Sequence, residues 1–228
     1  MNVRIVPGRA AAVVLALAAL APGVAAAHGG HKESKAPPPR EAPLYEPPAA
    51  GTYDLPPIRR VTEHRLTASD GKVAPVLGLG AGRATVVSFI YRNCTDAGGC
   101  PLSLAVMQRL DAVLAAKPDL ARRVRLVTVS FDPARDTPAR MKDLRGGLGP
   151  KGDWRFFTAP DDAALAPVLL DFGQDAVLTV GGDGKETGGI GHVLKVFLVD
   201  GRGDVRNIYS TGFLDERLLL NDLETVLR

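Results

Sequence analysis

Uninterrupted apolar runs mark two strands at the centre of the fold. Residues 84–91 (ATVVSFIY) and 124–131 (VRLVTVSF) are rich in β-branched and aromatic side chains. Such runs are typical of strands that are covered on both faces of a sheet. Shorter apolar segments, bounded by turn residues such as Asp70-Gly71, predict further strands. These lie at 61–66, 73–77, 154–158, 193–200 and 205–209.

Apolar residues spaced by three or four positions predict helices between these strands. Thr137 is a good N-cap and Pro138 a good first helical residue, and Gly146-Gly147 is expected to stop this helix near Leu144. Pro167 is expected to kink or shorten the helix that contains it. The four predicted helices cover residues 101–117, 138–144, 161–172 and 215–227.

The order of these elements indicates the fold class. Strands alternate with helices, and the chain closes with a hairpin and a helix. This order predicts an α/β fold, in which helices flank a mixed β-sheet. The folded domain is expected to span residues 53–228, and the glycine-rich residues 174–191 are expected to form a loop within it.

The N-terminal region is expected to contribute nothing to this core. Residues 1–27 have the pattern of a secretory signal peptide, because Arg4 and Arg9 precede an apolar stretch that ends in three alanines. An uncleaved membrane anchor is the alternative, since the stretch is nearly long enough to span a bilayer. Residues 28–52 contain repeated prolines and are expected to form an extended linker.

Export and charge limit the classes of partner. Without Arg4 and Arg9 the formal charge falls from +3 to +1, and no basic run with interleaved aromatic residues exists, so nucleic acid is not a predicted partner. Export predicts the periplasm, an oxidising compartment. Contact with the membrane is expected only through an uncleaved leader.

The only two cysteines, Cys94 and Cys100, lie on one turn between the first core strand and the first helix. Gly98 and Gly99 allow this turn to fold back, so that the two sulfur atoms can converge. Unpaired amide N–H groups at a helix start favour a thiolate, and Cys100 is expected to gain most from them. A thiolate is both a metal ligand and a nucleophile.

The number of donors favours copper among the metals that thiolates bind. Soft thiolate ligands select Cu(I), zinc or iron–sulfur clusters. Two cysteines cannot hold a cluster, and structural zinc requires four protein ligands. Cu(I) accepts two sulfur atoms and one imidazole, and Cu(II) is also reasonable with such donors. An oxidising compartment opposes the site, because a disulfide does not bind copper as two thiolates do.

Four histidines are candidates for the third ligand. His28 and His31 lie in the linker, where they could hold a metal loosely, and His64 lies in a peripheral strand. His192 lies between the glycine-rich segment and a core strand, at a loop edge that can reach Cys94. A single histidine in such a place is more often structural than a ligand, so the residues alone leave its role open.

A structural disulfide is the alternative explanation of the cysteine pair. Closing a seven-residue loop stabilises a protein by only about 2.4 kcal/mol on the chain-entropy model. This is little compared with a bond that closes a long loop. Two thiols at such a turn are therefore better explained as a working site.

Four segments together resemble the Sco (SenC-type) copper chaperone family. The similarity covers roughly residues 53–228, and the order and spacing of the segments make it specific. The segments are the turn FIYRNC…CPL at 89–102, SFDPARDTP at 130–138, GDWRF at 152–156, and His192 followed by FLVD at 197–200.

The resemblance implies a thioredoxin-like fold and a copper site formed by Cys94, Cys100 and His192. It also implies a role in assembling the copper centre of cytochrome c oxidase, by copper delivery or by reduction of client thiols. The partner would be the copper-accepting oxidase subunit or another periplasmic copper or thiol protein. The alternative is a thiol-disulfide oxidoreductase, with Cys94 and Cys100 as its catalytic pair, or a redox sensor without copper delivery.

The cysteine spacing departs from the pattern of the family. Five residues separate Cys94 from Cys100 here, whereas family members usually have three. The longer turn is expected to alter copper affinity or reduction potential. Asp96 is expected to be a solvated loop residue, and the alternative is that it shapes the site from behind the ligands. Asp132 and Asp136 match a motif of the family, and turn formation and helix capping are their expected roles.

Overall fold

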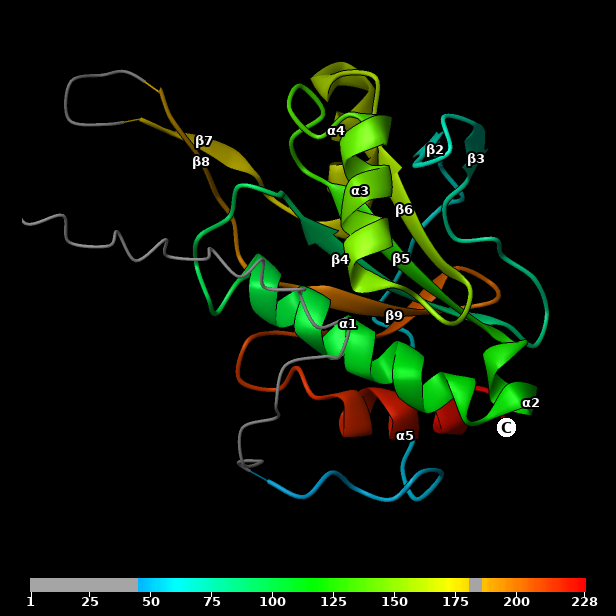
Figure 1. Ribbon diagram of the computed structural model, residues 1–228. Coiled ribbons are helices and arrows are strands. Elements are labelled where there is room, and N and C mark those ends of the chain that lie inside the picture. The colour runs from blue at the N-terminus through cyan, green and yellow to red at the C-terminus, as the bar shows by residue number, and fades with distance from the viewer. Residues whose placement is uncertain (1–44, 181–185) are drawn as a thin grey trace, which may run out of the picture. The chain divides into compact units, whose positions relative to one another are not determined.

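The computed structural model describes residues 45–180 and 186–228 (Figure 1). Eight strands form a mixed sheet in the order β1-β10-β9-β4-β5-β6-β2-β3, and β7 and β8 form a separate two-stranded sheet. The strands are β1 (Arg59–Arg60), β2 (Arg65–Ala68), β3 (Val73–Pro75), β4 (Ala84–Ile90), β5 (Val124–Ser130), β6 (Trp154–Thr158), β7 (Val177–Val180), β8 (Glu186–Gly191), β9 (Val196–Asp200) and β10 (Asp204–Tyr209).

The two apolar runs form the centre of the sheet, as the sequence predicts. β4 and β5 pair in parallel, with Ala84 opposite Val124 and Ile90 opposite Ser130. All seven residues of each strand are buried. β6 continues the parallel part beside β5, and β9 pairs with β4 in the antiparallel direction. The predicted mixed sheet is therefore confirmed. Because β4 and β5 are parallel, their C-terminal ends lie at the same end of the sheet.

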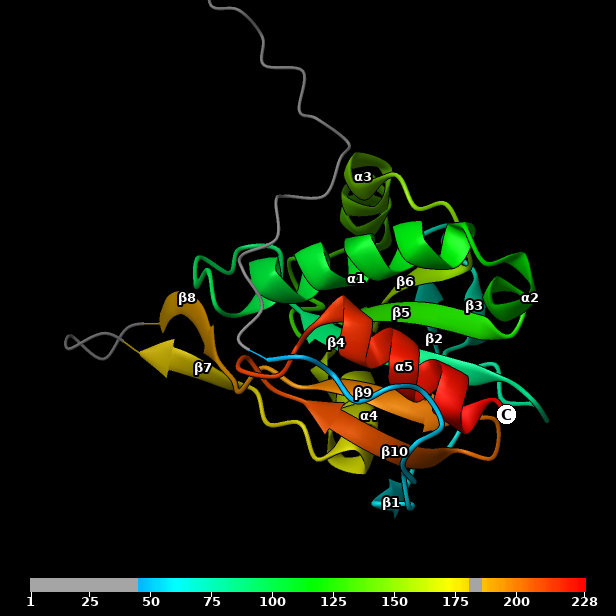
Figure 2. The same cartoon turned by 90° about the horizontal axis from the view of Figure 1, so that it is seen from below.

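Five helices flank this sheet on two sides. Figure 2 shows α1 and α5 on one face, with α4 behind the sheet. Val86 packs with residues of α1 and α5, whereas Val87 packs with residues of α4. The helices are α1 (Cys100–Ala115), α2 (Pro118–Ala121), α3 (Pro138–Leu148), α4 (Asp162–Phe172) and α5 (Glu216–Val226).

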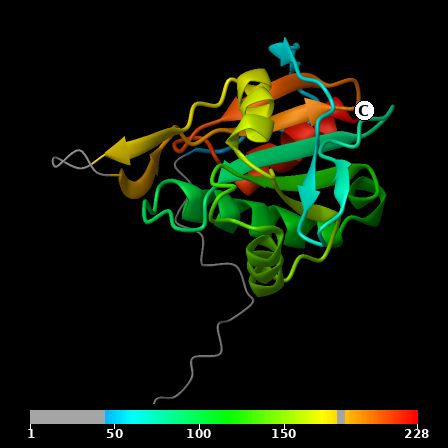
Figure 3. The same cartoon turned by 90° about the horizontal axis from the view of Figure 1, so that it is seen from above.

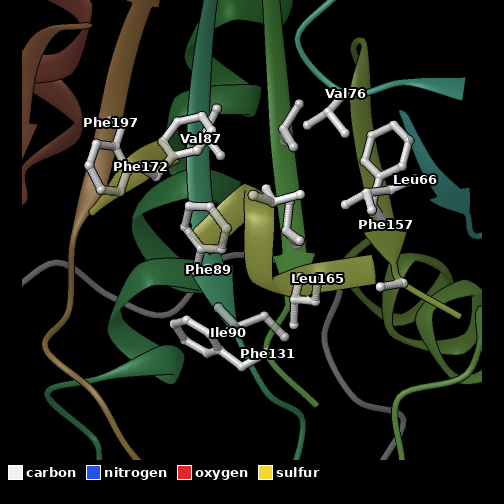
Figure 4. Close-up of a cluster of buried hydrophobic side chains, with 14 of the residues drawn as sticks. Leu66, Val76, Val87, Phe89, Ile90, Phe131, Phe157, Leu165, Phe172 and Phe197 are labelled. Atoms are coloured by element: carbon white, nitrogen blue, oxygen red, sulfur yellow. The ribbon is translucent and has the colours of Figure 1, made fainter. Parts of the chain in front are cut away.

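An aromatic cluster fills the space between α4 and the sheet (Figure 4). Phe89 of β4 lies 5.3 Å from Phe172 of α4 and 6.0 Å from Phe197 of β9, measured between ring centroids, and both pairs meet edge to face. Its ring is also stacked on that of Phe131, at 5.7 Å. The core thus continues from the middle of the sheet to Phe131, just beyond the end of β5.

Two expectations about helices and loops are wrong. α3 does not stop at Gly146-Gly147 but continues to Leu148, because Gly149, at φ 60°, supplies the left-handed residue that ends it. α4 contains Pro167 and ends at Phe172, where the sequence predicted its end. The glycine-rich segment is not only a loop, since β7 and β8 pair from Val177 and Gly191 onward.

The last residues of the predicted linker lie against α5. Gly51 N donates to Thr225 Oγ1 at 2.8 Å, and Asn221 Nδ2 donates to the carbonyl of Pro48 at 2.8 Å. Tyr53 donates to the buried carboxylate of Asp222. The predicted signal peptide and residues 28–44 lie outside the described residues. Within residues 45–180 and 186–228, no helix is long and apolar enough to cross a membrane.

Candidate metal centre

The two cysteines lie at the edge where β4 ends and α1 begins. Cys94 follows a turn in which its amide N–H donates to the carbonyl of Tyr91 at 3.2 Å. Cys100 is the first residue of α1 and is followed by Pro101, which needs no N–H partner there. Both thiols are free; Cys94 is half-buried and Cys100 is buried.

His192 reaches the cysteines from a segment more than ninety residues away in the chain. It directly follows β8, and its Nε2 atom lies 3.3 Å from Cys100 Sγ. The ligand atoms of Cys94, Cys100 and His192 all lie within 4.8 Å of one another. The structure therefore brings together all three residues that the sequence and the resemblance single out.

Aromatic rings hold the imidazole of His192 from two sides. Phe131 stacks on it with ring centroids 4.8 Å apart, and Tyr91 meets it edge to face at 5.8 Å. Both aromatic residues directly follow a central strand, so the sheet fixes their positions. The sequence offered no periodic signal for this packing, because neither residue is close to His192 along the chain.

An open, mainly apolar cavity of about 810 Å³ adjoins this packing. Phe131 and Ile190 contribute to its wall, together with Leu165 and Leu169 of α4. Phe131, which stacks on His192, therefore also faces this cavity.

Burial dominates the protonation of Cys100 in the metal-free protein. It raises the pKa of this thiol well above the usual value of 9.0, while hydrogen bonds from the backbone at Tyr91 and at Cys100 itself lower it by less. The backbone at the helix start lowers the pKa of Cys100, in the expected direction, but burial outweighs this effect in the metal-free protein. A bound cation would favour the thiolate directly, because metal binding displaces the proton of a cysteine ligand.

His192 is placed to act as a neutral ligand. Burial lowers its pKa below 6.5, and the more distant charge of Asp96 opposes this shift without reversing it. Its buried Nδ1 atom has no hydrogen-bond partner among the described residues. The neutral imidazole is the form that binds metals, and here its Nε2 atom faces the sulfur of Cys100.

Two aspartates have roles that the sequence did not reveal in full. Asp96 closes the cysteine turn, since its side chain accepts from Gly98 N at 3.0 Å and its carbonyl accepts from Gly99 N at 3.0 Å. Asp136 is buried and accepts from Ser130 Oγ at 2.7 Å and from Arg92 N at 3.0 Å. It therefore fixes the backbone two residues before Cys94, in addition to shaping its own turn.

The remaining candidates lie away from the thiols or outside the described residues. His64 does not lie in a strand, because β2 begins at Arg65; it is half-buried, and its Nε2 atom lies 2.9 Å from Asp171 Oδ2. The carboxylate of Asp132 accepts from the amide and the guanidinium of Arg135. His28 and His31 fall outside the described residues.

Comparison with family models places the chain among known proteins. The SCO1/SenC family model matches residues 61–228, which include both cysteines and His192. The chain belongs to the SCO1/SenC family. A search of curated proteins finds no significant match.

Solved structures of Sco proteins share the fold. ScoI of Bradyrhizobium japonicum with copper bound is 25% identical, with a TM-score of 0.56 over 73% of this chain and 99% of that one. A SCO1/SenC family lipoprotein of Bacillus anthracis is 22% identical, with a TM-score of 0.58 over 75% and 98%. BsSco, a member of the Sco family of cytochrome c oxidase assembly proteins, is 22% identical, with a TM-score of 0.57 over 75% and 95%. The predicted thioredoxin-like fold is confirmed.

Proposed function

We propose that this protein binds copper through Cys94, Cys100 and His192 and assists assembly of the copper centre of cytochrome c oxidase in the periplasm. The convergence of the three ligand atoms within 4.8 Å carries the proposal. Membership of the SCO1/SenC family and the likeness to a copper-bound ScoI support it.

The donor set suits a soft ion that the protein can release. Two sulfur atoms and one nitrogen suit Cu(I), which accepts low coordination, whereas structural zinc takes four protein ligands. Cys94 is half-buried and can be reached by an acceptor. Copper is therefore cargo, and the acceptor is the oxidase subunit that carries the copper centre or another periplasmic copper or thiol protein.

A Cu(I) titration tests the site. The reduced full chain is titrated with Cu(I) in competition with a chelator, beside Cys94→Ser, His192→Ala and, as a control, His64→Ala. Loss of one donor is expected to weaken binding at least tenfold in the first two variants. His64→Ala should bind as the parent does, because His64 pairs with Asp171 instead. Parental affinity in both site variants would show that these residues do not hold the ion.

A second candidate function is thiol-disulfide exchange, which the contrast between the two thiols favours. The more accessible Cys94 would attack a partner disulfide, and Cys100 would resolve the mixed disulfide. The chain would end with a Cys94–Cys100 disulfide, and the partner would gain two electrons and two protons as two thiols. This function needs both cysteines but not His192. If His192→Ala reduces a model disulfide as the parent does but binds Cu(I) weakly, thiol-disulfide exchange is separate from copper delivery.

A further inference from the structure

A second cavity lies at the end of the sheet opposite the thiols. It has a volume of about 330 Å³ and is bordered by the residues that precede β4 and β5, by the β9–β10 turn and by the end of α5. β4 runs from Arg83 toward Cys94, and its seven residues span about 20 Å. In Figure 1 the C terminus, which belongs to this cavity, lies beside α2, away from the start of α1.

Positive charge dominates the lining of this cavity. One aspartate, Asp200, is the only acidic side chain among the described residues that line it. Its carboxylate pairs with two of the arginines, at 3.1 Å from Arg206 and 3.4 Å from Arg202. The lining arginines are Arg83, Arg123, Arg202, Arg206 and Arg228.

Backbone oxygens hold several of these guanidinium groups without neutralising them. Arg123 donates to the carbonyls of Gly82 at 2.8 Å and Leu227 at 2.6 Å. Arg228 donates to the carbonyl of Ala50 at 2.6 Å. Within residues 45–180 and 186–228, neither arginine has a carboxylate side chain as a partner. Each guanidinium carries five N–H donors, so donors remain beyond those that the carbonyls use.

Negative charge at the end of α5 does not cancel this excess. The carbonyls at the end of a helix and the carboxylate of Arg228 disfavour an anion. Arg123 covers one of these carbonyls through its bond to Leu227. Arg83 and Arg202 also pair with carboxylates that do not line the cavity, Asp153 at 4.0 Å and Asp204 at 3.6 Å. The excess of positive charge therefore rests on Arg123 and Arg228, in a cavity large enough for a small ligand.

We propose that this arginine-lined cavity binds a phosphate-bearing anion, which is either a soluble phosphate ester or the headgroup of an anionic phospholipid. Planar guanidinium groups donate two parallel hydrogen bonds to phosphate oxygens, and a recess focuses their field on the ligand. The fixed orientation of Arg123 leaves little side-chain motion to be lost on binding. The site lies apart from the thiols, so it does not depend on the copper function.

Two probes distinguish the source of the phosphate group. The full chain is titrated calorimetrically with pyrophosphate at constant ionic strength. It is also sedimented with vesicles of phosphatidylcholine, with or without phosphatidylglycerol. Binding of pyrophosphate alone identifies a soluble ester, and binding that requires phosphatidylglycerol identifies a lipid headgroup. Either result supports the site if the variants below respond as expected, and saturable binding of neither probe overturns the proposal.

Neighbouring arginines provide a matched control. Arg123→Gln is expected to raise the dissociation constant at least fivefold. Arg122→Gln should change it less than twofold, because Arg122 pairs with Asp119 and does not line the cavity. Both variants lose one positive charge and keep the leader, so a general charge effect or insertion of the leader would affect them equally. Equal responses of the two variants overturn the proposal.

A second variant guards against a folding defect. Arg123 also anchors the end of α5, so Arg123→Gln could act through stability. Arg202 is 69% exposed and pairs only with Asp200 and Asp204 among the described residues. Arg202→Gln is therefore expected to fold as the parent does, which thermal unfolding checks, and to weaken binding severalfold. Parental binding by folded Arg202→Gln counts against the site.

Discussion

The two thiols of the candidate centre differ more than their shared turn suggests. Cys100 is 1% exposed and burial raises its pKa, whereas Cys94 is half-buried. Only the thiolate form attacks an alkylating reagent, and it must also be reachable. Cys100 is thus expected to be the less reactive of the two thiols in the free protein, because the effect of burial on its pKa outweighs that of the helix start.

Alkylation kinetics test this difference. At pH 7.5, iodoacetamide is expected to modify Cys94 at least ten times faster than Cys100 in the reduced full chain. Peptide mass spectrometry measures both rates. Because the folded pKa of Cys100 is raised, its rate should still be climbing above pH 9, where an unperturbed thiol levels off. Equal rates at pH 7.5 in the folded protein would contradict this picture.

Asp136 provides a second test at the residue scale. Asp136→Ala removes the acceptor of Arg92 N and Ser130 Oγ in a buried place, which is expected to cost about 1–3 kcal/mol of folding free energy. Urea unfolding measures the loss. Looser attachment of the cysteine turn should also weaken Cu(I) binding severalfold. The exposed Asp143 of α3 gives the control, Asp143→Ala, and equal effects of the two variants would exclude a positioning role.

The sequence could predict the site residues for chemical reasons and could not predict their surroundings. The chain has only two cysteines, and few histidines compete for the third position, so the family resemblance had only a small set of residues to assign. Phe131 and Asp136 belong to a segment whose pattern also fits a strand end and a turn. Their contacts with His192 and Arg92 depend on how separate elements meet, which no local pattern records.

At the element scale, burial on both faces made the central strands predictable. β4 and β5 read as unbroken apolar runs, and the structure confirms both within one residue. The strands β7 and β8 were missed because glycines interrupt the segment at 174–191, although β7 itself contains the β-branched residues Val177, Thr179 and Val180. The two strands pair with each other and not with the main sheet. α3 was expected to end too early, because two glycines inside a helix were taken for its stop signal.

The segment before β1 allows a paired test of element attachment. Tyr53 donates to the buried carboxylate of Asp222, whereas the hydroxyl of Tyr45 lies 3.5 Å from the carbonyl of Phe213. Tyr53→Phe is expected to lower the free energy of unfolding by about 0.5–1.5 kcal/mol. Tyr45→Phe should change it by less, because its bond is longer and more exposed. Urea unfolding of both variants decides, and equal losses would show that the Asp222 bond is not what fixes this segment.

At the scale of the whole molecule, the sheet separates two kinds of chemistry. The ends of β4 and β5 in the chain direction lead to the thiols and to the aromatic residues beside His192, and their opposite ends lead to the arginine-lined cavity. In Figure 3 the C terminus, which belongs to this cavity, lies at the other end of the sheet from β7 and β8. A parallel pair of strands makes this separation inevitable, since equivalent ends lie on the same edge. Copper binding and anion binding are therefore expected to be independent, and Arg123→Gln should keep the Cu(I) affinity of the parent.

Ligand linkage gives a test of the copper site that involves the whole fold. A ligand that binds only the folded state stabilises it by about 4.1 kcal/mol when its free concentration is a thousand times its Kd. For a domain of this size, that corresponds to a rise in Tm of about 8–16 °C. Buffered Cu(I) should produce this rise in the reduced chain and much less in reduced His192→Ala.

Oxidation of the same chain gives the contrasting result. A Cys94–Cys100 disulfide closes only a seven-residue loop, so it should stabilise the fold by no more than about 2.4 kcal/mol. Cu(I) should then add nothing, because the two sulfur ligands are consumed. Scanning calorimetry of reduced and oxidised protein, with and without buffered Cu(I), compares all four states. An equal rise in Tm with Cu(I) in the oxidised chain would show that the ion binds elsewhere. A rise in Tm that is confined to the reduced chain would show that Cu(I) stabilises the fold through the two thiols.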